Sequence, residues 1–275
     1  MIGAAGRRLF DRLEARLPGL AVRHPRSAFS VAGALGSIRN RLSRRWPHPE
    51  QVRTLFPSLP RSEAARVAWR IAALEARNRL LVECIRREVL PLVETPEAFA
   101  TLRPPLLLGT FHVGAIHALG PALEKLPGPV LALRQGRLYA AEPPVEVVST
   151  EGDEQGRAAV FLRALNHLQA GGFVVTALDV VPGVGLAVPC LGRTLELARG
   201  PFALARLAGV PLVPLTARWQ KGRVKVALGE ALTASGEAEL AAAAARWLDS
   251  YLLEFPGELG LGLLRSLLSS RPDPR

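Results

Sequence analysis

The sequence has little cysteine, little aromatic content and almost no lysine. Its two cysteines, Cys84 and Cys190, lie far apart and belong to no CxxC pair or zinc-ligand spacing. This excludes a disulfide framework and a zinc finger, and it predicts a reducing compartment. Aromatic residues make up 5% of the 275 residues although 49% are hydrophobic, so alanine, leucine and valine must form the core. Such a composition is typical of helices packed around a buried sheet rather than of a β-sandwich.

Long hydrophobic runs are also missing. The best candidate, Ala28 to Ile38, has about eleven residues, whereas a membrane-spanning helix needs about twenty. The beginning of the sequence lacks the order of basic start, apolar centre and small-residue cleavage site that marks a secretory signal. We therefore expect a protein that stays inside the cell.

Charge is strongly one-sided, because the net charge is +11 and only three of the 35 basic residues are lysine. Residues 1–53 contain eleven arginines against Asp11, Glu14 and Glu50. Within them, Arg7 to Leu17 places its leucines near one helical face and its charges on the other, which is typical of a helix at an interface. We therefore expect peripheral attachment to an anionic membrane surface, on the cytoplasmic face of the inner membrane. An ordinary surface helix is the alternative.

A basic surface also attracts nucleic acid or an acidic partner protein. The arginines, however, are not interleaved with stacking aromatic residues, and they match no helix-turn-helix or zinc-finger pattern. We therefore expect no nucleic-acid partner. The composition divides the chain into a basic amphipathic region at 1–60 and one α/β domain at 61–275.

The rest of the chain alternates between strand-like and helix-like segments. The clearest helix begins near Ser62 and ends at Pro91, with one apolar stripe and with arginines left to solvent. The stripe is Val67, Ile71, Leu74, Leu81 and Ile85, and the arginines are Arg66, Arg70, Arg77 and Arg86. We further expect strands at 106–108, 130–133, 145–149, 173–178, 211–217 and 223–228, helices at 155–169, 201–208, 237–254 and 258–268, and a Gly/Pro-rich loop at 182–193. This alternation predicts a central mixed, largely parallel sheet wrapped by helices.

The stretch Leu106 to Gly120, LLLGTFHVGAIHALG, is the centre of this pattern. Its apolar block suits a strand buried on both faces, which Gly109 and Thr110 then end. His112 follows just beyond the expected carboxyl end, where open α/β sheets collect ligands and reactive side chains. His112 is therefore the first functional candidate, with a hydrogen-bonded structural histidine as the alternative.

Several segments between Arg77 and Phe255 resemble the bacterial lipid A lauroyl/myristoyl acyltransferases, within the lysophospholipid acyltransferase superfamily. They are HVGAIH at 112–117, Arg134, RAAVFLRALNHLQAGGFVVTALD ending at Asp179, and VPCLGRTLELARGPFALARLAGVPLVPL. The resemblance implies a glycerol-phosphate acyltransferase-like fold. It also implies transfer of an acyl chain from an acyl carrier protein or coenzyme A thioester to a lipid or glycolipid hydroxyl, with His112 as general base and with no metal or cofactor.

The resemblance also suggests anion-binding residues. Arg134 and Arg193 become candidates for contacts to donor or acceptor. The segment with Gly192, Arg193, Arg199 and Gly200 is expected to hold a phosphate near the reacting hydroxyl. Arginine binds phosphate bidentately, and a helix beginning after Gly200 would present unpaired N–H groups. A tight loop with solvated arginines is the alternative.

One departure bears on catalysis. The family has an aspartate or glutamate five residues after the histidine, whereas this chain has His117. A neutral His117 could accept a hydrogen bond from His112 but supplies no negative charge. Asp179 ends another expected strand at the same sheet edge and is our preferred substitute, ahead of Glu124, although it could equally be a turn or cap residue.

Two further departures concern the substrate. The amino-terminal membrane span is absent, and FPGELGLGLLRS replaces the tryptophan-rich end of the family. Both weaken the expectation of lipid A as acceptor. The alternative function is a catalytically silent relative that binds lipid or acyl carrier protein, and His117 is its main support.

Overall fold

The computed structural model describes residues 4–42, 47–86, 93–134, 145–180, 185–221 and 223–270. Its main sheet has seven strands in the order β1-β9-β8-β2-β5-β3-β4. These are β1 (Val93–Glu94), β2 (Leu106–Gly114), β3 (Val130–Arg134), β4 (Val145–Ser149), β5 (Phe173–Ala177), β8 (Leu212–Gln220) and β9 (Arg223–Leu228). All neighbours pair in parallel except β8 and β9, which are antiparallel. The expected mixed, largely parallel sheet is confirmed.

Strand β2 lies at the centre of the sheet, between β5 and β8, and both of its faces are covered. Leu107, Phe111 and Val113 belong to one hydrophobic core, whereas Leu106 and Leu108 belong to the other. Such double burial is expected for a central parallel strand and explains its continuous apolar run.

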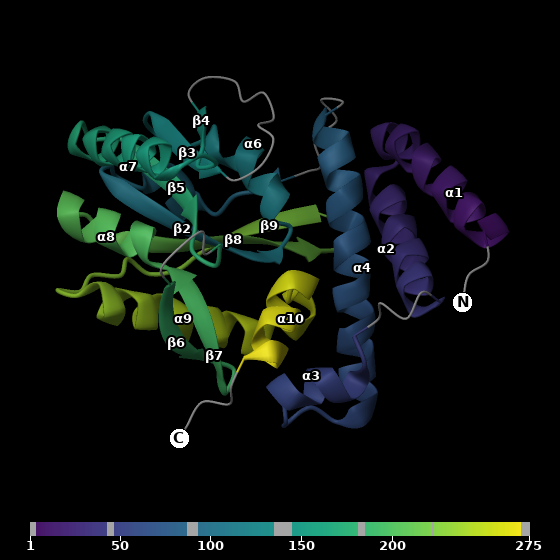
Figure 1. The fold of residues 1–275 in the computed structure, drawn as a ribbon. Coiled ribbons are helices and arrows are strands. Elements are labelled where there is room, and N and C mark those ends of the chain that lie inside the picture. The colour runs from purple at the N-terminus through teal and green to yellow at the C-terminus, as the bar shows by residue number, and fades with distance from the viewer. Residues whose placement is uncertain are drawn as a thin grey trace.

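Helices cover both faces and one end of the sheet. They are α1 (Ala4–Arg23), α2 (Pro25–Leu42), α3 (Pro49–Leu55), α4 (Arg61–Arg86), α5 (Glu97–Thr101), α6 (Leu119–Leu123), α7 (Glu154–Gln169), α8 (Arg199–Ala208), α9 (Glu237–Glu254) and α10 (Leu261–Ser269), with 3-10 turns η1 (Ile116–Ala118) and η2 (Pro256–Glu258). Figure 1 shows α4 beside the sheet, with α2 and then α1 on its outer side. Residues 87–92, where the expected long helix was to end at Pro91, lie outside the described residues.

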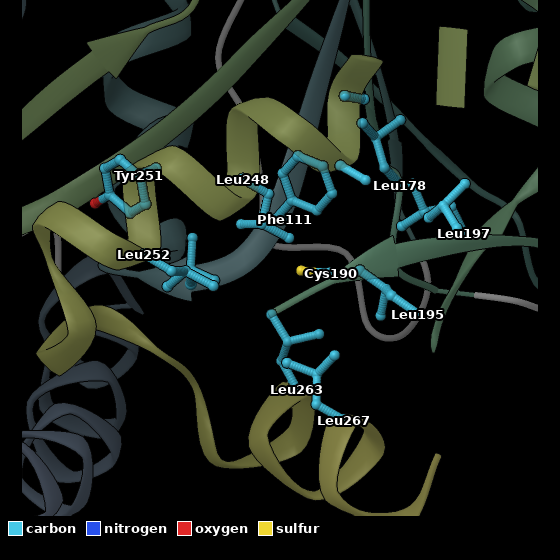
Figure 2. Packing of buried hydrophobic residues seen from close by; sticks show 14 of the residues in the cluster. Phe111, Leu178, Cys190, Leu195, Leu197, Leu248, Tyr251, Leu252, Leu263 and Leu267 are labelled. Atoms are coloured by element: carbon cyan, nitrogen blue, oxygen red, sulfur yellow. The ribbon is translucent and has the colours of Figure 1, made fainter. Parts of the chain in front are cut away.

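The first core lies between the sheet, helices α7 to α10 and a two-stranded hairpin, β6 (Gly185–Cys190) and β7 (Arg193–Ala198). Figure 2 shows Phe111 of β2 among Leu178, Leu248 and Cys190, with Leu263 and Leu267 of α10 below. The ring of Phe111 also stacks near Trp247, with 6.1 Å between centroids. Phe111 therefore anchors the end of β2 in this core.

The second core lies on the other face and includes side chains of α1, α2 and the second half of α4. Helix α2 approaches α4 closely because it carries glycines: a Cβ at Gly36 would overlap the Cβ of Ala76, and one at Gly33 would lie 2.8 Å from Arg77 Nε. The amino-terminal helices thus join the packing of the sheet. No helix in the described ranges is long and apolar enough to cross a membrane.

Two local expectations were wrong, and one helix, α3, which His48 caps, was not expected. The Gly/Pro-rich stretch at 182–193 contains strand β6, because Val188 and Cys190 alternate with exposed residues and are buried against the first core. Arg77 is half-buried rather than left to solvent, since α2 covers that part of α4.

Candidate functional site

The site is built on the carboxyl end of β2, which continues to Gly114 instead of stopping at Gly109. Against β8, Thr110 pairs with Leu215 and Gly114 with Ala217, so four steps on β2 match two on β8 and the strand bulges. Gly114 has φ +61°, and a Cβ there would overlap the Ala217 carbonyl. His112 therefore lies inside a bulged strand end, not beyond it. Bulges of this kind re-aim side chains next to active sites.

The second component is Asp179, which follows β5. Strands β5 and β2 are parallel neighbours, so their carboxyl ends meet at one edge of the sheet. Asp179 Oδ2 accepts the backbone N–H of His112 at 2.8 Å, and Oδ1 lies 2.8 Å from His112 Nδ1. The Asp179 side chain is only 4% exposed, whereas that of His112 is 49% exposed. The carboxylate is therefore enclosed while the imidazole faces solvent.

This geometry assigns the tautomer of His112. A carboxylate only accepts, so Nδ1 carries the hydrogen and Nε2 keeps its lone pair. The hydrogen bond with Asp179 and the charge of Asp179 raise the pKa of His112, although burial and the charge of Arg134 oppose the rise. The arrangement is that of a general base whose partner orients it and stabilises its imidazolium form.

His117 and Arg134 lie within electrostatic reach of His112. Burial, aided by the charges of Arg134 and His112, lowers the pKa of His117 to about 4, so His117 is neutral near pH 7. Nδ1 of His112 is hydrogen-bonded to Asp179, and no hydrogen bond joins His112 to His117 in the described structure. Glu124 is exposed where α6 ends and likewise forms no hydrogen bond with His112 there.

The amino terminus of α8 reaches the same edge. The Ala198 N–H donates to the Leu178 carbonyl at 2.7 Å, one residue before Asp179. A Cβ at Gly200 would meet nothing within 4 Å, so the first turn of α8 is open. Arg199, however, already has a partner, because its Nε lies 2.6 Å from Oε2 of Glu237.

Gly192 and Arg193 are not part of this site. They lie at the tip of the β6–β7 hairpin, where Cys190 pairs with Arg193, whereas Ala198 is at the opposite end. Arg193 and Ala198 are five residue steps apart along β7, which is about 16 Å in an extended strand. The guanidinium of Arg193 donates to the Ser270 carbonyl at 3.4 Å, and the tip also binds Asp249 of α9. The expectation that Arg193 lies near the reacting hydroxyl is therefore not met.

Sequence reasoning missed Glu258, which lies behind the bulge. Its Oε2 is shielded from solvent and has no hydrogen-bond partner among the described residues. Burial raises the pKa of Glu258 to about 7, although a hydrogen bond from the Trp219 backbone and the charges of Arg77, Arg218 and Arg70 oppose this. A lone glutamate in FPGELG carries no signal of burial, so only the fold identifies it.

No group of three or more histidine, cysteine, aspartate or glutamate side chains in the described ranges is arranged to hold a metal ion. The chemistry available at this edge is that of the His112–Asp179 pair, next to the cation Arg134 and the open helix terminus of α8.

Comparisons with known proteins give a likeness in structure but not in sequence. Neither a scan against protein-family models nor a search of curated proteins found a match. The crystal structure of the 1-acyl-sn-glycerophosphate (LPA) acyltransferase PlsC from Thermotoga maritima superposes over 86% of this chain and 99% of that chain, with a TM-score of 0.43 and 13% identity. A superposition at this level does not by itself assign an activity. Membership of the lipid A branch stays a prediction.

Proposed function

We propose that the protein is an acyltransferase that moves a fatty acyl chain from an acyl thioester to a hydroxyl of a lipid or glycolipid. The main support is the His112–Asp179 pair, a solvent-facing imidazole fixed by an enclosed carboxylate at the carboxyl edge of the sheet. The sequence resemblance supplies the reaction class, and the geometry supplies a base suited to it.

In the proposed reaction, Nε2 of His112 takes the proton of the acceptor hydroxyl as its oxygen attacks the thioester carbonyl carbon. The carbon–oxygen bond forms, the carbon–sulfur bond breaks, and the leaving thiolate takes the proton back from the imidazolium. Asp179 lowers the free energy of the charged intermediate state because its carboxylate faces Nδ1–H. No metal or cofactor enters this scheme.

Two neighbours are suited to the negative charges of the reaction. Arg134 ends β3 on the same edge and acts electrostatically on His112. The first turn of α8, which includes Gly200, has unpaired N–H groups that favour an oxyanion or a phosphate. His117 contributes shape rather than charge, because it is neutral.

The alternative is a catalytically silent relative that binds lipid or acyl carrier protein. It depends on His117, which occupies the position where the family has an acid. In the described structure Asp179 offers a carboxylate to His112 from another strand. The geometry therefore favours turnover over silence.

The test combines acyl carrier protein and coenzyme A thioesters of several chain lengths with a total bacterial lipid extract. We expect thioester consumption together with a new acylated lipid. His112→Ala should lower turnover by about 10²–10⁴-fold or more, because it removes the base. His24→Ala, at an exposed histidine between α1 and α2, is the matched control and should retain activity. An unchanged rate in His112→Ala would refute the base, and no turnover with any donor would favour the silent relative.

A further inference from the structure

A pocket on the opposite side of α4 from α10 belongs to no site described above. It lies where α2, α4 and the carboxyl end of β8 meet, and its volume is about 290 Å³. Its walls are formed by Arg26, Phe29, Ser30, Arg77, Trp219 and Lys221. Figure 1 shows α2 and α4 side by side in this part of the molecule.

Three of these six side chains are cationic, and none of the three forms an ion pair with a carboxylate in the described part of the chain, although the charge of Glu258 acts on Arg77 electrostatically. No carboxylate of the described residues lies within ion-pair distance, 4.0 Å, of Arg26, Arg77 or Lys221. Glu94 pairs with Arg223, which is the main cause of its lowered pKa, and the charge of Arg26 only adds to this effect. Like charges gathered without a counter-ion are costly, so the pocket favours an anion.

Arg77 is held in place for such a ligand. Its Nε donates to the Phe29 carbonyl at 3.4 Å, and its guanidinium lies over Gly33, where a Cβ would come within 2.8–3.1 Å. Burial lowers the pKa of Arg77, the charge of Glu258 raises it, and that of Arg70 lowers it further. A half-buried guanidinium that is oriented in this way, and whose terminal nitrogens have no hydrogen bond to another described residue, is pre-organised to bind an anion.

The remaining walls fit the rest of a small ligand. The rings of Phe29 and Trp219 lie 4.5 Å apart and form an apolar side, and Trp219 Nε1 donates to Asn78 Oδ1 at 3.4 Å, which fixes the indole. An apolar wall with a few convergent polar groups is typical of small-molecule sites.

We propose that this pocket binds a phosphate group, carried either by a soluble phosphate ester or by a lipid headgroup. Phosphate offers several acceptor oxygens, which match one guanidinium fork and two further cations better than a single carboxylate does. The proposal does not depend on acyl transfer at His112.

Calorimetric titration of the full chain with glycerol 3-phosphate tests the shared chemistry. Arg26→Gln/Lys221→Gln should weaken binding about tenfold or more, since two charge-assisted contacts are removed. The matched control is Arg66→Gln/Arg265→Gln, which removes two exposed charges outside the pocket. It should bind like the wild type.

A second pair of variants tests the role of Arg77 without changing charge. Gly33→Ala should displace the guanidinium and weaken binding, whereas Gly19→Ala, whose Cβ would meet nothing within 4 Å, should not. Circular dichroism shows whether both variants remain folded.

Vesicle sedimentation separates the two sources of phosphate. If the source is a lipid, the Arg26→Gln/Lys221→Gln variant should no longer sediment with phosphatidylglycerol vesicles, whereas the control variant should. Glycerol 3-phosphate should then reduce the binding of the wild type to these vesicles. If the source is soluble, both doubles should bind vesicles equally while only the pocket double loses glycerol 3-phosphate. Equal binding of both probes by the two doubles, or no saturable binding of either probe by the wild type, would overturn the proposal.

Discussion

Asp179→Asn should keep one of the two hydrogen bonds that the carboxylate makes with His112 and reverse the direction of the other. The backbone N–H of His112 requires an acceptor, so the amide oxygen of the new asparagine should take the place of Oδ2. The amide NH₂ would then face Nδ1 of His112 in place of Oδ1. Because an NH₂ group only donates, Nδ1 must become the acceptor and the ring hydrogen must move to Nε2.

Nε2 of His112 would then already carry a hydrogen, so it could not accept the proton of the acceptor hydroxyl. The same change in a serine-protease triad costs about 10⁴ in kcat, and we expect a loss of about 10³–10⁴-fold here. The fold should persist, because an amide fits the same enclosed space and still accepts from the His112 backbone.

The pH dependence adds a second readout. The active form of His112 is the neutral one, and Asp179 raises its pKa above the ordinary 6.5, so the wild-type rate should fall as the pH drops through a value above 6.5. In Asp179→Asn this acid limb should move to lower pH, because the favourable charge is gone. The assay is the initial rate of thioester consumption between pH 5 and pH 9, roughly the range in which histidine titrates in proteins.

Asp153→Asn is the matched control, since Asp153 is an exposed carboxylate that caps α7 and accepts from Gly156 at 2.8 Å. It should leave turnover unchanged and cost little stability, because asparagine caps a helix about as well as aspartate does. If Asp179→Asn kept the wild-type rate and pH profile, the assigned tautomer and the base mechanism would both be refuted.

Three further predictions follow from the charges. His117→Ala should leave kcat near the wild-type value, because His117 is neutral above about pH 4; a loss as large as that of Asp179→Asn would contradict this. The folded chain keeps a proton on Glu258 up to about pH 7, whereas the unfolded chain releases it near pH 4.5, so the free energy of unfolding should fall by up to about 3 kcal/mol between these two pH values. Urea titrations at the two pH values measure this difference, which should be smaller in Glu258→Gln. The arginine-rich amino-terminal region should bind anionic vesicles at low salt and dissociate at high salt, each basic residue contributing at most about 1 kcal/mol; equal sedimentation with neutral vesicles would contradict it.

Elements with strong local periodicity could be predicted from the sequence. The strands at 145–149 and 223–228 and the helix at 237–254 have the predicted bounds. In β9 and α9, burial follows the residue spacing, so local pattern and tertiary packing agree. The sheet class followed from the order of these segments.

Elements that depend on distant contacts could not be predicted. Proline and glycine in 182–193 indicated a loop, but Pro189 faces outward on β6, where its missing N–H costs little. Arg193 resembled a phosphate ligand by its neighbours in sequence, yet the hairpin carries it to Ser270. The position of a side chain at a hairpin tip depends on register, which the sequence did not specify.

The candidate site was partly predictable. Both His112 and Asp179 follow apolar runs, and adjacent parallel strands bring such positions to one edge. The sequence did not establish that the strands are adjacent, because β5 is inserted between β2 and β3 although it follows both along the chain. It also did not reveal the bulge, which depends on Ala217 of β8.

The position of His112 is held mainly by backbone contacts. Phe111 anchors one side of the bulge in the first core, and Gly114 permits close approach to β8 on the other. A Cβ at Gly260 would overlap the carbonyl of His112, so the segment after η2 closes over the strand end. Asp179 then binds both the backbone N–H and the ring of His112. One carboxylate thus sets the strand end and the tautomer together, which is why an amide at 179 should leave the strand end in place while disabling the base.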